Sequence, residues 1–493
     1  MAKIGMVSLG CSKNQVDAER MLAAIRGAGH ELSADAGLCD AVIINTCAFI
    51  EEAKRESIDY ILEFVKLKEE NRIKAVAVTG CLAERYRDEV AKEIPEADVI
   101  LGIGSNAQIV AAIENALSGQ KTAAFGDKLD LPLEGKRVIS NLPFYAYLKI
   151  AEGCDNLCSY CAIPLIRGKF RSRTMENIIA EAEVLAMQGV TELNLVAQDT
   201  TRYGEDIYGR LMLPELLRGL CKIEKLRWIR VLYCYPERVT DELLDVIAAE
   251  PKIVKYMDIP IQHCEGEILA AMNRRGDKNT LAALFAKIRE KIPGVALRTT
   301  IIAGFPGETD AHFQSLLDFV KEIKFDRLGC FAYSKEEDTP AAELTNQIGD
   351  EIKQRRCGQI MELQSIVMQS IAENMLGKAV EVLCEGFDRY AGLWFGRSYM
   401  DAPDIDTKVF FTTGTPVKPG DYVTVLAEDV LDGDIVGVAV TDIDTQKNEA
   451  RKLFLKNAED MQQQSVVNGT SEMTMDEIDD IIAEARKDKR GVI

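Results

Sequence analysis

Three closely spaced cysteines are the clearest candidates for chemistry in this sequence. Cys154, Cys158 and Cys161 form a CxxxCxxC pattern. Three thiolates at this spacing can hold three irons of a four-iron cluster, which leaves the fourth iron without a protein ligand and open to a small molecule. A structural zinc site would need a fourth ligand, but the next cysteine is Cys221 and the chain has only 3 histidines, all distant in sequence. The pattern therefore favours an iron-sulfur cluster over zinc.

Three further cysteines each follow a short apolar run. Cys11 follows residues 3–9, Cys47 follows residues 41–45, and Cys81 follows residues 75–79. Such runs predict buried parallel strands, and ligands bind at the carboxyl ends of strands in open α/β sheets. We therefore expect these thiols to converge on a second metal site, although they are far apart in sequence. The alternative is that three small cysteines are simply buried at strand ends, which is common for this residue type.

The segments around these cysteines predict a doubly wound parallel sheet domain. Helical patterns at residues 14–27 and 51–68 separate the three predicted strands, as expected for a parallel sheet covered by helices. We place this domain at residues 1–118. A stretch with Gly and Pro, residues 119–143, is expected to link it to the next domain.

The central part of the chain, residues 144–370, alternates strand and helix patterns. Six β-like runs lie at residues 144–151, 192–197, 228–233, 256–261, 296–303 and 327–333. This alternation predicts parallel β-α units. The first strand leads into Cys154 and the fifth into the turn from Gly304 to Glu308, so both motifs are expected at the carboxyl ends of the strands. Gly304 and Gly307 permit close approach of a ligand to the backbone, although an ordinary turn before a helix would also explain them.

Charge and composition restrict the partners and the compartment. The chain has 59 basic and 79 acidic residues, a net charge of −20, which disfavours general nucleic-acid binding and suits basic partners. Arg167, Arg171 and Arg173 are candidates to orient an acidic target or a phosphate, with a solvated basic turn as the alternative. No run of about 18 apolar residues is present, and residues 1–10 resemble a buried strand rather than a signal peptide. We expect a cytoplasmic protein.

The last quarter of the chain has a different sequence pattern from the domains before it. Short strand patterns with Gly and Pro turns lie at residues 378–384, 393–397, 416–417, 421–427 and 435–440, which predicts a small β-barrel over residues 376–443. Residues 444–493 predict a flexible tail with a possible helix, because a capping-box pattern from Thr474 to Glu477 precedes an apolar stripe.

An aromatic residue, Tyr160, stands directly before the last cysteine of the CxxxCxxC pattern, and the central domain resembles the radical S-adenosylmethionine (SAM) superfamily. The resemblance implies a partial (β/α)6 barrel and a 4Fe-4S cluster whose open iron binds SAM. It also implies a set of SAM-binding residues: Tyr160, Gly304, Pro306, Gly307 and Glu308.

The combination of three domains over residues 1–443 resembles the methylthiotransferase family. One branch (MiaB type) modifies a tRNA adenosine, and another (RimO type) modifies an aspartate in small-subunit ribosomal protein twelve. Residues 8–17, 198–204 and 396–406 favour the second branch. The resemblance implies a TRAM domain at the C-terminus and an electron donor such as flavodoxin or ferredoxin. It implies two 4Fe-4S clusters, an auxiliary one held by Cys11, Cys47 and Cys81 and a SAM-binding one held by Cys154, Cys158 and Cys161.

The implied reaction is the replacement of C–H by C–S at an unactivated carbon, here the β-carbon of an aspartate. Such a step needs radical chemistry that the cofactors carry, so no side chain is predicted to be a catalyst on its own. Residues 377–443 contain 5 basic and 12 acidic residues, and 5 minus 12 gives a local net charge of −7. An acidic surface suits a basic ribosomal protein, with Asp401, Asp404 and Asp406 predicted near the contact. The alternatives are the tRNA branch and a non-catalytic iron-sulfur redox protein.

Overall fold

The structure, a computed structural model, describes residues 1–440 of the 493. The chain divides into two compact units, Met1–Ile371 and Ala372–Ile493. The predicted tail at residues 444–493 lies outside the described residues. In the described part of the chain, no helix is both long enough and apolar enough to cross a membrane.

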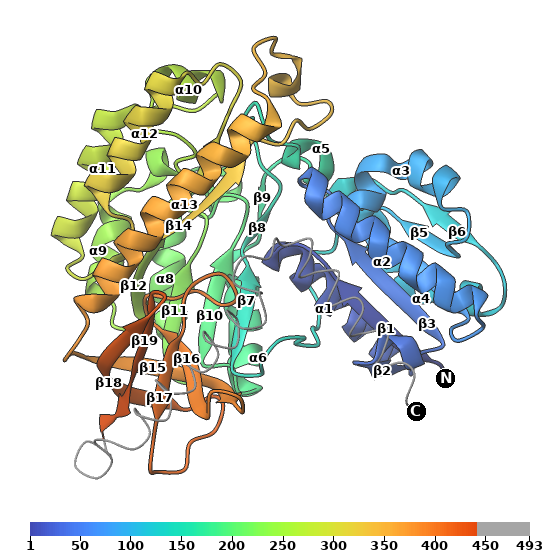
Figure 1. Cartoon of the computed structure of the whole chain (residues 1–493). Helices are drawn as coiled ribbons and strands as arrows, with labels where there is room; N and C mark the ends of the chain where they lie inside the picture. The colour runs from blue at the N-terminus through green and yellow to red at the C-terminus, as the bar shows by residue number, and fades with distance from the viewer. Residues whose placement is uncertain (441–493) are drawn as a thin grey trace, which may run out of the picture. The chain divides into compact units, whose positions relative to one another are not determined.

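The first unit begins with a six-stranded parallel sheet in the order β2-β1-β3-β4-β5-β6 (Figure 1). Apolar side chains of α1 and α4 pack on one face and those of α2 and α3 on the other. The predicted doubly wound sheet is therefore confirmed, with three short strands that the apolar runs did not indicate. The elements are β1 (Lys3–Ser8), α1 (Ser12–Gly27), β2 (Glu31–Ser33), β3 (Ala41–Thr46), α2 (Glu51–Glu69), β4 (Ala75–Gly80), α3 (Cys81–Glu93), β5 (Val99–Leu101), α4 (Ile109–Leu117) and β6 (Thr122–Ala124).

A second six-stranded parallel sheet follows in the order β7-β10-β11-β12-β13-β14. The predicted partial barrel is thus confirmed, strand by strand. Its strands are β7 (Tyr145–Lys149), β10 (Glu192–Val196), β11 (Trp228–Val231), β12 (Ile253–Asp258), β13 (Ala296–Ala303) and β14 (Arg327–Ala332). The helices between and after them are α6 (Met175–Met187), α7 (Glu205–Tyr208), α8 (Leu213–Cys221), α9 (Asp241–Ala249), α10 (Gly266–Ala271), α11 (Lys278–Lys291), α12 (Asp310–Ile323) and α13 (Asp350–Glu373).

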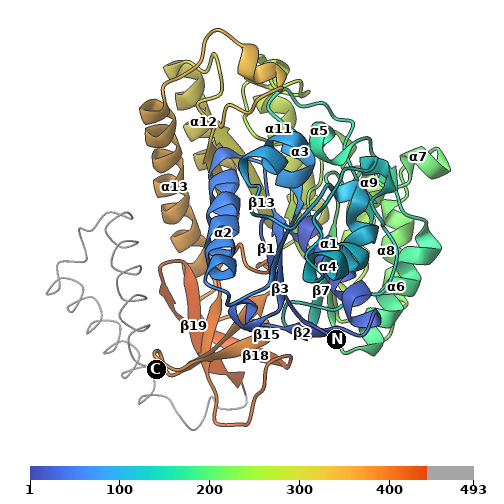
Figure 2. The ribbon, with the colours of Figure 1, turned by 90° about the vertical axis from the view of Figure 1, so that its right-hand side faces the viewer.

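The two sheets of the first unit share part of one core. A short hairpin, β8 (Ala151–Glu152) and β9 (Arg171–Ser172), flanks α5 (Ile163–Arg167). Ala162 and Ile166 are fully buried in the apolar cluster between the N-terminal sheet and its helices α2 and α3. On the other side, α1 contacts β7, and Figures 1 and 2 show α1 between the two sheets. The N-terminal domain and the partial barrel therefore form one body.

The second unit contains a closed five-stranded barrel in the order β15-β16-β17-β19-β18. The prediction of a small barrel is confirmed, but its third strand was placed wrongly. The strand is formed by Val409–Thr412 and not by residues 416–417, because the apolar run of β17 pairs with both β16 and β19, whereas Pro416 has no N–H to donate to a sheet. The strands are β15 (Ala379–Asp388), β16 (Leu393–Ser398), β17 (Val409–Thr412), β18 (Tyr422–Leu431) and β19 (Asp434–Ala439).

Candidate functional site

The three N-terminal cysteines lie at the carboxyl ends of adjacent strands. Cys11 follows β1, Cys47 follows β3 and Cys81 follows β4, and these strands are neighbours in the sheet. Gly10 precedes Cys11 with a φ of 84°, and a Cβ there would lie 2.8 Å from the Cys47 sulfur, so only glycine fits. Gly80 is similar, with a φ of 94°. The fold thus brings three thiols to one edge of the sheet, and glycines leave the backbone beside two of them without side chains.

The three thiols differ in their electrostatic surroundings. Burial alone would raise the pKa of the Cys11 thiol, but the positive charges of Lys13 and Arg167 outweigh burial and hold this pKa below its usual value. Burial and the neighbouring Cys81 and Cys11 raise the pKa of Cys47 to about 12. The three thiols therefore influence one another's pKa values across the end of the sheet. The buried thiols of Cys47 and Cys81 would have to lose their protons to bind a metal.

The CxxxCxxC segment forms a loop between β8 and α5. Gly153 starts this loop with a φ of 76°, and a Cβ there would lie 2.1 Å from a backbone carbonyl oxygen. The Cys154 N–H donates to the Gly168 carbonyl at 3.1 Å, and the Cys161 N–H donates to the Cys158 carbonyl at 3.0 Å. Burial raises the pKa of Cys154 to about 11. The loop is therefore held by its own backbone with the thiols grouped inside it.

Packing connects this loop with the turn after β13. The Ser159 hydroxyl donates to the Ala271 carbonyl at 2.7 Å, which fixes the loop against α10. The Tyr160 ring packs on an apolar cluster that contains Phe305 and Tyr333. The structure thus brings the two predicted motifs, the CxxxCxxC loop and the Gly304–Glu308 turn, to the same end of the barrel.

The Gly304–Glu308 turn is itself densely packed. Lys353 and Asn346 lie where Cβ atoms at Gly304 and Gly307 would stand, at 2.4 and 2.5 Å. The Glu308 carboxylate is buried, accepts the Gly304 N–H at 3.0 Å and pairs with Arg356 at 2.7 Å. Packing within the chain therefore already requires both glycines. The Glu308 side chain stabilises the turn from inside.

Sequence reasoning missed two groups of side chains near Cys158. The Tyr235 hydroxyl lies 3.8 Å from the Cys158 sulfur, and the Arg274 guanidinium stacks on the Tyr235 ring at 4.3 Å. At the end of β10, the buried Asp199 accepts hydrogen bonds from Asn156 at 2.9 Å and Arg238 at 3.0 Å. For Tyr235 and Asp199 the available signal was their position, because each follows a strand at the carboxyl end of the barrel, whereas Arg274 follows α10.

A buried ionic network joins the two cysteine groups. Arg167, the last residue of α5, donates to the Cys81 sulfur at 3.3 Å, to Asn14 at 3.0 Å and to Asp17 at 2.6 Å. Lys149 on β7 also pairs with Asp17, and with Glu152 at 2.6 Å. We call Asn14, Asp17, Lys149, Glu152 and Arg167 the Arg167 network. It links the N-terminal sheet to the barrel with complementary charges.

The other two predicted arginines also have partners within the chain. Arg173 is buried, pairs with Glu181 at 2.7 Å and donates to Glu134 at 2.9 Å. Arg171 is half-buried and donates to the Lys128 carbonyl at 3.1 Å. These guanidinium groups hold the linker and α6 to the barrel.

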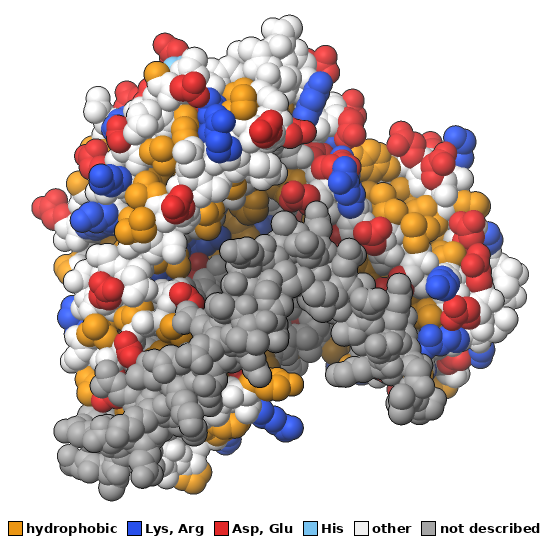
Figure 3. Space-filling view, viewed as in Figure 1, with side chains coloured by type: hydrophobic (Ala, Val, Ile, Leu, Met, Phe, Trp, Pro, Cys, Tyr) orange, Lys and Arg blue, Asp and Glu red, His pale blue; other side chains and the backbone are white. Residues whose placement is uncertain are grey.

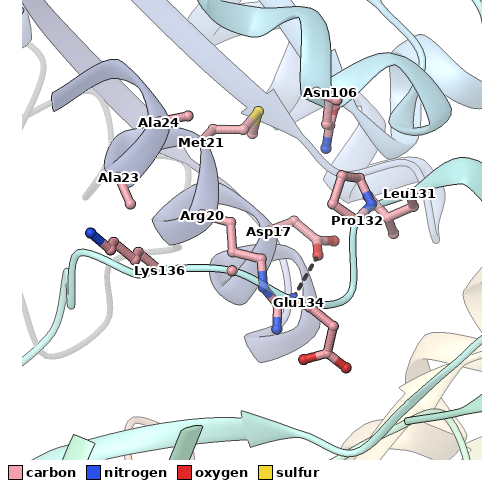
Figure 4. Close-up of a pocket in the computed structure, with 12 residues that line it drawn as sticks. Asp17, Arg20, Met21, Ala23, Ala24, Asn106, Leu131, Pro132, Glu134 and Lys136 are labelled. Atoms are coloured by element: carbon pink, nitrogen blue, oxygen red, sulfur yellow. Dashed lines mark ion pairs between the residues drawn. The ribbon is translucent and has the colours of Figure 1, made fainter. Parts of the chain in front are cut away.

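A cavity of about 290 Å³ lies beside the Arg167 network, between α1 and the linker (Figure 4). Asp17 and Arg20 line it from α1, and Pro132 and Glu134 line it from the linker. Cysteines are absent from the residues that line this cavity. The candidate chemistry therefore lies on the other side of Asp17, where Arg167 meets Cys81.

The donor set fits clusters better than single ions. Within residues 1–440, no group of three or more His, Cys, Asp or Glu side chains is close enough to hold one metal ion. A four-iron cluster makes a different demand, because each thiolate binds its own iron and the sulfurs stay apart. Three cysteines that follow adjacent strands and three in the CxxxCxxC loop could supply such thiolates.

In the second unit, the three predicted contact residues have unequal surroundings. Asp401 is buried and accepts hydrogen bonds from Ser398 at 2.6 Å and Thr407 at 2.8 Å. Asp406 accepts the Ala402 N–H at 2.9 Å, whereas Asp404 is exposed with a φ of 66°. Asp401 and Asp406 therefore shape the loop between β16 and β17, and Asp404 is the exposed member of the three.

Family models match three consecutive segments of the chain. These are the uncharacterized protein family UPF0004 at residues 3–102, the radical SAM superfamily at residues 148–320 and the TRAM domain at residues 376–440. The fold resembles the radical SAM methyltransferase TsrM from Kitasatospora setae, solved with cobalamin and a [4Fe-4S] cluster bound. The TM-score is 0.53 at 14% identity, over 69% of this chain and 76% of that one. Fold and cysteine arrangement together define a radical SAM protein with an additional cysteine-bearing N-terminal domain.

Curated relatives specify the family within this class. The ribosomal protein uS12 methylthiotransferase RimO of Lachnoclostridium phytofermentans is 47% identical over 89% of this chain and 100% of its own length. The protein of the same name from Caldanaerobacter subterraneus subsp. tengcongensis is 48% identical with the same coverages. This chain belongs to the RimO family of methylthiotransferases. The resemblance inferred from the sequence is thereby confirmed.

Proposed function

We propose that this protein adds a methylthio group to the β-carbon of an aspartate in ribosomal protein uS12. The observation that carries the proposal is the pair of cysteine groups in one compact unit, joined by the Arg167 network. We assign Cys11, Cys47 and Cys81 to an auxiliary 4Fe-4S cluster, and Cys154, Cys158 and Cys161 to a SAM-binding 4Fe-4S cluster. When bound, the two clusters together with SAM would supply the radical, the sulfur and the methyl group.

The protein's own residues would position these groups and protect them from water. Arg167 would donate to the sulfur of Cys81 and neutralise part of the negative charge of an auxiliary cluster. Tyr235 and Arg274 would cover Cys158 and keep solvent from the SAM-binding cluster. Tyr160 and the Gly304–Glu308 turn, which lie at the same end of the barrel, remain the candidates to contact SAM.

Mass spectrometry of the product tests the proposed substrate. The anaerobically reconstituted protein, with SAM, dithionite and purified uS12, is expected to convert one uS12 aspartate to its methylthio form. A deletion strain is expected to lack this modification in uS12 while its tRNA hydrolysates are unchanged. Methylthiolated tRNA adenosine in place of modified uS12 would contradict the proposal and assign the protein to the tRNA branch.

We further propose that uS12 is recognised in the cytoplasm by the acidic TRAM barrel, and that a flavodoxin or ferredoxin supplies the electron. Support comes from the net charge of −7 over residues 377–443, since ribosomal proteins are basic. On the face of the molecule shown in Figure 3, the visible Lys and Arg side chains are interspersed with Asp and Glu. The coloured part of that face, which belongs to the described residues, shows no broad basic area for a nucleic acid.

Neutralising Asp404 is expected to weaken uS12 binding about two- to threefold at low salt and to reduce its salt dependence, as for a charge at the rim of an interface. Asparagine is the suitable replacement because it tolerates the left-handed backbone of this residue. The matched control is Asp59→Asn on α2, an equally exposed carboxylate of the first unit. Titration of labelled uS12 at several salt concentrations measures the effect. Equal affinities for both variants would contradict a role of this loop in binding.

A further inference from the structure

Lys13 extends from the auxiliary cysteine group to the rim of the barrel. It stands two residues after Cys11 in α1, and only 7% of its surface is exposed. Its ammonium nitrogen lies 3.3 Å from the centre of the Tyr233 ring, just beyond the end of β11. The side chain thus carries a positive charge from one domain of the first unit to the other.

The segment on which this charge rests also reaches the CxxxCxxC loop. Tyr233 lies under Lys13, which stands two residues after Cys11, whereas Tyr235, two residues later in the chain, lies 3.8 Å from the Cys158 sulfur. Lys13 and the segment from Tyr233 to Tyr235 therefore connect the start of α1, beside Cys11, with the CxxxCxxC loop.

The backbone at this point is strained and firmly held. Tyr233 has a φ of 60°, a conformation that costs a non-glycine residue about 1–3 kcal/mol and that is common at functional sites. Its N–H donates to Asp258 at 2.9 Å, and its carbonyl accepts the Thr200 N–H at 3.1 Å. The ends of β10 and β12 thus fix the ring on which the ammonium group of Lys13 rests.

The charge of Lys13 is not balanced by a carboxylate in the structure. Among residues 1–440, no ion pair joins Lys13 to an Asp or Glu. Tyr233, the Cys11 thiol and Asp258 interact with Lys13 electrostatically, but the Asp258 carboxylate already accepts hydrogen bonds from Arg298 at 3.0 Å and from the Tyr233 N–H. A buried ammonium group without a carboxylate partner is costly, and an anion in this space would remove that cost.

We propose that Lys13 binds the side-chain carboxylate of the substrate aspartate and so holds its β-carbon between the two cysteine groups. The inference rests on the proposed function. The γ-carboxylate is bonded directly to the β-carbon. An ion pair between Lys13 and this carboxylate would therefore also position the carbon that reacts. It also explains how an aspartate is distinguished from an asparagine of the same shape, because only the carboxylate provides the missing negative charge.

Binding of uS12 to the reconstituted protein tests this role. Purified uS12 and its Asp→Asn form at the modified residue serve as probes in the presence of SAM. Wild-type protein is expected to bind the aspartate form roughly 10- to 30-fold more tightly, the range for a charge-assisted hydrogen bond. Lys13→Met, which keeps the stem of the side chain, is expected to bind both forms equally, and Lys13→Arg to restore part of the preference.

Lys74→Met is the matched control, because Lys74 is an exposed lysine of the same domain that pairs with Asp40 at the surface. It is expected to retain the wild-type preference. A Lys13→Met protein that still prefers the aspartate form as strongly as wild type would overturn the inference. The inference would also be overturned if Lys13→Met kept the preference for the aspartate form but lost auxiliary iron or changed the electron paramagnetic resonance spectrum of the cluster. Lys13 would then act on Cys11 and its cluster and not on the substrate. Failure of wild-type protein to modify uS12 at all would instead refute the proposed function.

Discussion

Replacing Cys47 by alanine is expected to abolish methylthiolation while leaving reductive cleavage of SAM intact. Replacing Cys158 by alanine is expected to abolish both. The reason is the separation of the two cysteine groups, which lie at the ends of strands in two different sheets. A cluster that loses one thiolate no longer presents a single open iron, but the loss in one sheet leaves the ligands in the other unchanged.

Release of 5′-deoxyadenosine and mass spectrometry of uS12 measure the two activities on the same samples. Iron content is expected to fall by about half in each variant, from two clusters to one. Cys384→Ala provides a control, because this cysteine is buried in the TRAM barrel. A Cys47→Ala protein that modifies uS12 at the normal rate would show that the auxiliary assignment is wrong.

Replacing Lys149 by methionine is expected to cost about 3–5 kcal/mol of the free energy of unfolding of the first unit, the usual result of removing one partner from a buried ion pair. Lys149 is fully buried between Asp17 and Glu152. Methionine would leave these two carboxylates in the interior, balanced by Arg167 and, at 4.0 Å from Asp17, by Arg20. Urea denaturation of both proteins, followed by circular dichroism, measures the difference.

The matched control is Lys169→Met, because Lys169 is exposed in the nearby strand connection; its effect is expected to stay within about 0.5 kcal/mol. Burial would raise the pKa of Glu152, but Lys149 and Arg167 outweigh burial and hold this pKa well below its usual value. The wild-type stability from Glu152 is therefore present at neutral pH and is lost as pH falls below about 4. A Lys149→Met protein as stable as wild type would contradict this account of the network.

Much of the fold follows from local patterns in the sequence. The long apolar strands such as β3 and β4 are fully buried, and their runs are unmistakable. The edge strands β2 and β6 have only 3 residues each and are partly exposed, so hydrophobicity did not reveal them. The strand β17 was misplaced because the irregular loop before it contains Pro and Asp residues that resemble a longer turn region.

The candidate site, like the fold, could be predicted from the sequence only in part. Cysteine spacing, and the position of three cysteines directly after apolar runs, predicted the two groups of thiols, since both can be read from the sequence. Lys13, Tyr233 and Tyr235 could not be found in this way, because their importance arises from contacts between distant parts of the chain. Lys13 and Tyr233 are 220 residues apart (233 minus 13), and Cys158 and Tyr235 are 77 apart. Arg167 was noticed as a cation near the cluster motif, but its internal partners Asp17 and Cys81 became visible only in three dimensions.

The placement of α5 has a consequence for how the enzyme would turn over. The loop that carries Cys154, Cys158 and Cys161 runs directly into this helix, and the buried Ala162 and Ile166 anchor it in the core of the N-terminal domain. A hinge motion between the two domains would have to expose these buried side chains to solvent. Turnover is therefore expected to leave this junction closed, so that the substrate segment enters and leaves while the two domains stay joined.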